Sequence, residues 1–109
     1  MQGGPDFSVT HRRVDGAVIV LPRGEIDLAT VDAVQAELQQ AQAEPHTELV
    51  LDLRALTFLD STGIRLIVEL ARDLGPAFAV VRGSGEVERV FALVGLDGRV
   101  RMLDRAPGE

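Results

Sequence analysis

The chain has 109 residues, 46% of them hydrophobic, and a formal net charge of −6 at pH 7. This length fits one domain with a single core, and the negative charge argues against nonspecific binding of DNA or RNA, which needs a basic face. The chain has no cysteine, which excludes disulfides, thiolate nucleophiles and Cys-ligated zinc. It has no secretion signal and no apolar stretch near the ~18 residues that span a membrane, so we expect a cytoplasmic protein without a membrane segment.

The N-terminal part of the chain has the pattern of a β-hairpin. Apolar and polar residues alternate over residues 7–12, which predicts a half-buried edge strand. Asp15-Gly16 is a tight-turn signal, and the apolar run over residues 17–21 is typical of a strand that is covered on both faces. We expect residues 1–5 and 106–109 to be short frayed ends.

Three later segments have the apolar spacing of amphipathic helices. Residues 29–43 carry apolar side chains at intervals of three and four, and the pattern stops before Pro45. A second helix is predicted over residues 61–74 and a third over residues 85–94. Gly95-Leu96 is expected to form the C-terminal cap of the third helix.

Short apolar strands are predicted over residues 49–53, 77–81 and 100–103, so the element order is β-β-α-β-α-β-α-β. Strands that are joined through helices pair in parallel, because their connection must cross over the sheet. We therefore predict an α/β fold with a mixed sheet of four to five strands and an N-terminal β-hairpin, packed against three or four helices.

Two loops follow parallel strands and are the first candidates for a binding site, since ligands and partners of such sheets meet the carboxyl ends of the strands. They span residues 23–28 and 54–63. The second loop leads directly into a helix, where Asp60 or Ser61 is the natural N-cap because a short oxygen-bearing side chain accepts a free backbone N–H. Asp27 has the same relation to the first helix. For an isolated Asp-Ser pair before a helix, capping is the most common role.

On a helical wheel, Ser61, Arg65 and Glu69 lie together on the face opposite a broad apolar arc. Ser61 is therefore expected at the surface, with Arg65 leaning back toward it from the next turn. A phosphate on Ser61 would meet free backbone N–H groups and the positive end of the helix dipole. Gly63 falls on the buried side, where close packing on the sheet explains a glycine. We expect Leu66 to be partly exposed.

The chain offers few groups for catalysis. His11 and His46 are its only histidines, and we interpret both as ordinary edge or loop residues, because a catalytic triad needs three converging groups. The sequence contains no nucleophile elbow, no phosphate-binding loop and no metal-ligand spacing. We predict that the protein is not an enzyme and requires no cofactor.

Three segments, in register, carry a family resemblance. They are Gly24-Glu25-Ile26-Asp27, residues 53–66 with Phe-Leu-Asp-Ser-Thr-Gly-Ile, and residues 87–96 with the ending Gly-Leu. Together they make the chain similar to the STAS domains of anti-sigma factor antagonists, a family of bacterial sporulation and stress regulators. The resemblance covers most of the chain and implies a single STAS domain over residues 1–109, with a core of about 6–104.

The resemblance implies a partner-switching mechanism. The unphosphorylated protein would bind an anti-sigma factor that is also a serine kinase and carries ATP and magnesium, and so free a sigma factor. The kinase would phosphorylate Ser61 and release the protein, and a serine phosphatase would reset it. We expect a monomer when free, without direct contact to nucleic acid. The implied partner surface consists of Glu25, Asp27, Asp60, Ser61, Thr62, Gly63, Ile64, Arg65 and Leu66.

Other roles of STAS relatives form the alternatives. The chain could be a STAS subunit of a lipid-transport ATPase complex or of a stress-sensing particle, without phosphorylation. It could also bind a nucleotide directly, although it has no Gly-rich phosphate loop. The lipid-transport relatives generally lack the motif serine, so the presence of Ser61 favours the phosphorylated switch.

Overall fold

The computed structural model describes residues 6–109, so the expectation for residues 1–5 lies outside it. No helix in this part of the chain combines the length and the apolar composition that crossing a bilayer requires. The elements, in chain order, are β1 (Ser8–Val14), β2 (Ala17–Ile26), α1 (Val31–Ala43), β3 (Glu48–Asp52), β4 (Leu56–Leu59), α2 (Ser61–Leu74), η1 (Gly75–Ala77), β5 (Phe78–Val81), α3 (Gly85–Val94), η2 (Leu96–Gly98) and β6 (Arg101–Leu103).

The sheet is mixed and has the strand order β1-β2-β3-β5-β6, with β4 as a sixth strand that pairs with β2. β1 and β2 form the predicted antiparallel hairpin, in which Val14 faces Ala17 across the turn. Asp15 occupies the left-handed region of this turn, with φ of 54°, a conformation that Asp tolerates better than most residues. All other pairings are parallel, so the predicted fold class is confirmed.

Strand β4 was not expected, and the sheet therefore has six strands instead of four or five. β2 runs ten residues, so its first half pairs with β3 and its last three residues pair with β4. Most of the predicted loop 23–28 is strand, and part of the predicted loop 54–63 is β4. The end of β2 is not predicted as a strand because it contains Pro22 and Gly24, and both residue types are normally depleted in strands.

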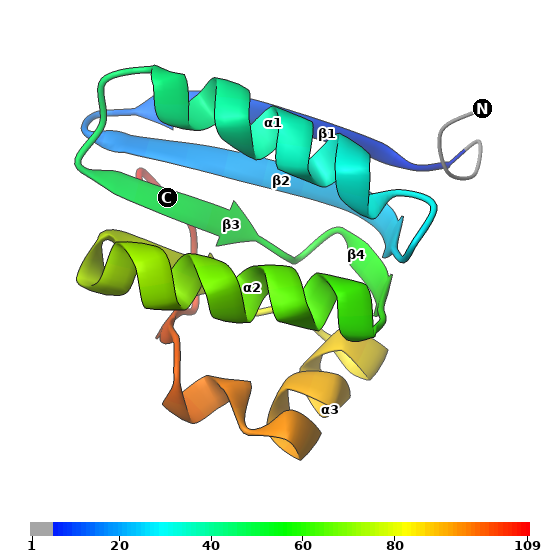
Figure 1. Cartoon of the computed structure of the whole chain (residues 1–109). Coiled ribbons are helices and arrows are strands. Elements are labelled where there is room, and N and C mark those ends of the chain that lie inside the picture. Colours follow the sequence, from blue (N-terminus) through cyan, green and yellow to red (C-terminus); the bar gives the residue numbers. More distant parts are fainter. Residues whose placement is uncertain (1–5) are drawn as a thin grey trace.

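Helices α1 and α2 lie side by side on one face of the sheet, and α3 lies beyond α2 (Figure 1). The main core fills the space between the sheet and these helices and includes Leu38 of α1, Ile67 of α2 and Phe91 of α3. Gly95 ends α3 with φ of 73°, and Leu96 folds back into the core as predicted. The helical layer thus closes one side of the sheet.

The other face of the sheet is covered by the C-terminal segment. Ala106 is buried against Ile19 and Val50 in a second, smaller core. Glu109 makes two hydrogen bonds of 2.7 and 2.8 Å with the guanidinium of Arg54, whose other edge binds the buried carboxylate of Asp52. These hydrogen bonds from Arg54 hold the pKa of Glu109 at about 2. The expectation of a frayed C-terminus is therefore wrong.

His11 joins the edge strand β1 to α1. Its two ring nitrogens lie 2.7 Å from a carboxylate oxygen of Glu37 and 2.7 Å from one of Glu44. Both carboxylates favour the imidazolium form, so the hydrogen bonds with Glu37 and then Glu44 raise the pKa of His11. His11 is therefore not an ordinary edge residue, but its role is to hold α1 on the sheet.

We predict that His11→Gln lowers the free energy of unfolding by about 1 kcal/mol at pH 6, since hydrogen bonds between charged groups are lost. The raised pKa means that this contribution is fully present below the ordinary histidine pKa of about 6.5 and disappears as the pH rises through the folded-state pKa. Urea unfolding at pH 6 and pH 9 measures the difference. In a Glu37→Gln, Glu44→Gln background, His11→Gln should cost much less at pH 6 than it does in the wild type, and little in either background at pH 9; an equal cost at pH 6 in the two backgrounds would contradict the ion-pair account.

Candidate functional site

The candidate site lies at the carboxyl ends of β2 and β4, where the two candidate loops meet. Ile26 and Leu59 are neighbours in the parallel pairing of these strands. The backbone N–H of Asp60 then donates to the carbonyl oxygen of Ile26 at 3.1 Å, and α2 begins at the next residue, Ser61. The ends of the two candidate loops therefore lie side by side.

Asp60, and not Ser61, is the N-cap of α2. Its Oδ1 accepts the backbone N–H of Thr62 at 2.9 Å, that of Gly63 at 3.3 Å, and the Thr62 hydroxyl at 2.5 Å. Burial alone would raise the pKa of Asp60, but the hydrogen bonds outweigh burial and hold this pKa below its ordinary value. A carboxylate is thus fixed at the positive end of the α2 dipole.

Ser61 is the first residue of α2 and is exposed. Because Asp60 caps the helix, no hydrogen bond within residues 6–109 engages the Ser61 hydroxyl. Arg65 follows one turn later with a side chain that is 82% exposed, and its ion pair is with Glu69 at 3.7 Å. The expected lean of Arg65 toward Ser61 is therefore not observed, and the hydroxyl is open to solvent.

The buried side of the first turn of α2 rests directly on the strands. A Cβ atom added to Gly63 would lie 2.3 Å from Cδ1 of Leu59 and 2.9 Å from Cγ2 of Ile26, so close packing does explain this glycine. Leu66 is only 7% exposed and belongs to the main core, which corrects the expectation that it is partly exposed. Ile64 is half-buried at the margin of the same core.

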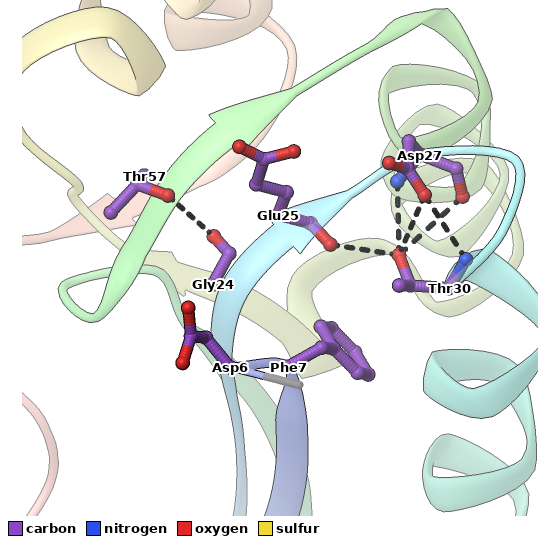
Figure 2. Close-up of a pocket in the computed structure, with 7 residues that line it drawn as sticks. All are labelled: Asp6, Phe7, Gly24, Glu25, Asp27, Thr30 and Thr57. Atoms are coloured by element: carbon purple, nitrogen blue, oxygen red, sulfur yellow. Dashed lines mark hydrogen bonds between the residues drawn. The ribbon is translucent and has the colours of Figure 1, made fainter. Parts of the chain in front are cut away.

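The turn between β2 and α1 is held by Asp27 and Thr30 (Figure 2). Asp27 Oδ1 accepts the backbone N–H of Ala29 at 2.9 Å and of Thr30 at 3.2 Å. The buried Thr30 hydroxyl donates to the Glu25 carbonyl oxygen at 2.8 Å and accepts the N–H of Asp27 at 3.0 Å. The N-cap of α1 is Thr30, so Asp27 fixes the turn that precedes α1 and is not its cap, which corrects the predicted capping role.

A hollow of about 270 Å³ lies next to this turn. Three carboxylates stand around it, from Asp6, Glu25 and Asp27, and the wall formed by β4 carries Thr57, whose hydroxyl donates to the Gly24 carbonyl oxygen at 3.0 Å (Figure 2). The hollow is thus acidic and suits a cationic group. Sequence reasoning missed Asp6 and Thr57, because the β1–β2 hairpin brings Asp6 to this place and the unexpected pairing of β4 with β2 brings Thr57.

Neither histidine belongs to the site. His11 binds the C-terminal half of α1, and His46 precedes β3 at the opposite end of that strand, with its Nδ1 2.6 Å from the Glu44 carbonyl oxygen. Within the described residues, no group of three or more potential metal-ligating side chains could hold a metal ion. The chemistry that the site offers is therefore an accessible hydroxyl beside an acidic hollow.

Comparison with known proteins places the chain in a family. The model of the STAS domain matches residues 8–105 of the chain. The anti-sigma-F factor antagonist RsfB of Mycobacterium tuberculosis is 31% identical over 105 residues, which cover 94% of this chain and 86% of that protein. The anti-sigma F factor antagonist of Paenibacillus polymyxa is 32% identical over 94 residues, covering 83% and 79%.

Solved structures agree. An anti-sigma factor antagonist from Mycobacterium paratuberculosis superposes with a TM-score of 0.82 at 30% identity, covering 94% of this chain and 90% of that one. SpoIIAA in its unphosphorylated form shares the fold, with a TM-score of 0.70 at 24% identity, covering 93% and 89%. The chain belongs to the STAS domain family, within its anti-sigma factor antagonists.

We predict that Asp60→Ala and Ser61→Ala differ sharply in stability. Loss of the Asp60 cap should lower the free energy of unfolding by about 1 kcal/mol, whereas Ser61→Ala removes no hydrogen bond and should change it by less than about 0.5 kcal/mol. Chemical denaturation of both variants measures the difference. An equal or larger cost for Ser61→Ala would show that Ser61 serves as the cap.

Gly63→Ala should destabilise the protein by about 1–3 kcal/mol, because the added methyl group overpacks the contact with Leu59 and Ile26. This loss would occur although alanine is the better helix former. Gly98→Ala is the matched control, since a Cβ at Gly98 meets nothing within 4 Å. Thermal or urea unfolding of the two variants gives the comparison, and equal stability would refute the close-packing account.

Proposed function

We propose that the chain is an anti-sigma factor antagonist whose activity is switched by phosphorylation of Ser61. In the unphosphorylated state it binds an anti-sigma factor that is also an ATP-dependent serine kinase, and this binding frees a sigma factor. Transfer of phosphate to Ser61 releases the protein, and a serine phosphatase restores it. The protein is the substrate in this cycle and acts in the cytoplasm.

The observation that carries the proposal is the division of roles between Asp60 and Ser61. A serine that caps a helix has its hydroxyl engaged with the backbone, but here Asp60 makes those hydrogen bonds. The Ser61 hydroxyl is left exposed on a rigid helix end, which is what a nucleophile in phosphoryl transfer requires.

Electrostatics supports release after the transfer. A kinase must bring the γ-phosphate of ATP within about 3–3.5 Å of the Ser61 oxygen. After transfer, the phosphoserine carries about −1.5 to −2 charges and faces the phosphates of the remaining ADP. Asp60 lies at the same helix end, and its carboxylate is held ionised. The capping residue therefore adds a negative charge next to the phosphate and does not neutralise it. Repulsion and the cost of desolvating the phosphate then favour dissociation.

The proposal is tested by binding. Tagged wild-type protein is isolated from its native host, and we expect it to retain an ATP-binding anti-sigma factor that mass spectrometry identifies. Calorimetry with the purified partner should give similar affinities for wild type and Ser61→Ala, and an at least tenfold weaker affinity for Ser61→Asp.

Ser84→Asp is the matched control, because Ser84 is another exposed serine at a helix N-terminus, the N-cap of α3. It should bind like the wild type. If Ser61→Asp also binds like the wild type and no phosphate is found on Ser61, the chain is a constitutive STAS subunit and Ser61 is not a switch.

A further inference from the structure

Large apolar side chains are exposed at the end of the sheet that carries Ser61. Four such side chains are exposed in the described part of the chain, and two of them, Leu28 and Phe58, belong to this end. Leu28 follows Ile26 by two residues and Phe58 precedes Asp60 by two, so they flank the hydrogen bond that joins the two segments. Leu28 is 78% exposed and Phe58 39%.

The local backbone holds both side chains outward. Leu28 lies within the turn that Asp27 and Thr30 fix through their hydrogen bonds. Phe58 lies in the middle of β4, opposite Glu25 of β2. A single exposed leucine needs no explanation, but an aliphatic and an aromatic side chain on rigid elements beside a functional serine have the composition of an interface centre.

The charged groups next to Leu28 and Phe58 indicate which kind of partner surface can bind there. Glu25 is paired with Phe58 across β2 and β4, and Asp27 directly precedes Leu28. With Asp6, these two carboxylates make the adjacent hollow acidic. A second copy of the chain would bring identical carboxylates face to face, which opposes self-association. A surface that combines an apolar depression with arginine or lysine side chains at its border is complementary in both shape and charge.

We propose that Leu28 and Phe58 are the apolar anchors through which the anti-sigma factor is bound, in an apolar depression bordered by cationic side chains. This inference rests on the proposed function and adds the source of the affinity. The anchors hold the partner over the Ser61 hydroxyl by burial of apolar surface. Phosphate on Ser61 then weakens the complex by electrostatic repulsion, while the apolar contact of Leu28 and Phe58 itself is unchanged.

The two contributions differ in their response to salt. Apolar burial changes little between about 0.05 and 0.5 M salt, whereas repulsion between exposed charges is screened over this range. Substitution of an anchor should therefore weaken binding equally at low and high salt. The effect of Ser61→Asp should shrink as the salt concentration rises.

The experiment measures the affinity of the purified anti-sigma factor for Leu28→Ser, Phe58→Ser and the control Leu93→Ser. Leu93 is 77% exposed, nearly the same as Leu28, but it lies on α3. We expect each anchor variant to bind about tenfold to a hundredfold more weakly, mainly through faster dissociation, and Leu93→Ser to bind within twofold of the wild type. Leu28→Ser should unfold like the wild type, since its side chain is exposed.

Different failures have different meanings. If both anchor variants bind like the wild type while Ser61→Asp is released, the proposed function stands and the anchors are refuted. If Leu93→Ser is weakened as much as Leu28→Ser, the apolar contact is not specific to the Ser61 end and the inference is overturned. If wild-type protein binds no anti-sigma factor, the proposed function fails and the inference fails with it.

Discussion

Helix α2 approaches the end of β2 so closely that a Cβ atom at residue 63 would displace the side chains of Leu59 and Ile26. The space that an alanine methyl group would need is filled by Leu59 and Ile26, and the Asp60 N–H is bonded to the Ile26 carbonyl oxygen in the same place. With the helix start fixed against the strand, Asp60 is directed back onto the backbone as the cap and Ser61 outward. The exposure of the Ser61 hydroxyl is therefore a consequence of packing beneath it.

Both faces of the sheet are occupied, and the candidate site lies at the carboxyl ends of β2 and β4, between them. Helices α1 and α2 cover one face (Figure 1), and the segment that ends in Glu109 covers the central strands on the other. Arg54, whose guanidinium pairs with Asp52 and Glu109, belongs to the connection between β3 and β4, so the connection that leads towards Ser61 also holds the C-terminal segment. The turn at Asp27 lies at the same carboxyl end of the sheet.

Much of this architecture could be predicted from the sequence. The bounds of α2 and α3 follow from apolar spacing and clear stop signals, and the hairpin follows from Asp15-Gly16. Strand β4 could not be found in this way, because only Leu56 and Leu59 of its four residues are buried and strands are recognised by alternation. β4 forms because it pairs with the end of β2, a distant segment of the chain, and local sequence patterns carry no information about this pairing.

The same limit applies to side chains whose environment is set by distant contacts. The wheel places Leu66 correctly on the apolar arc of α2, but its burial depends on the neighbouring α1, which lines one shallow groove with it. The fixed position of Glu109 depends on Arg54, 55 positions earlier in the chain. By contrast, Asp60 and Ser61 were located by local rules, and only the choice between them as the cap required the structure.

In the proposed switch, the phosphate is transferred to the hydroxyl of Ser61, which is exposed at the first residue of α2. The most direct measurement is to incubate the unphosphorylated protein with the anti-sigma factor that it retains and Mg-ATP, and to map the phosphate by mass spectrometry. The account predicts one phosphate, on Ser61, and none on Ser8 or Ser84, the other two serines of the chain. Phosphate on either of those residues, or a stable complex with an active kinase that transfers none, would contradict it.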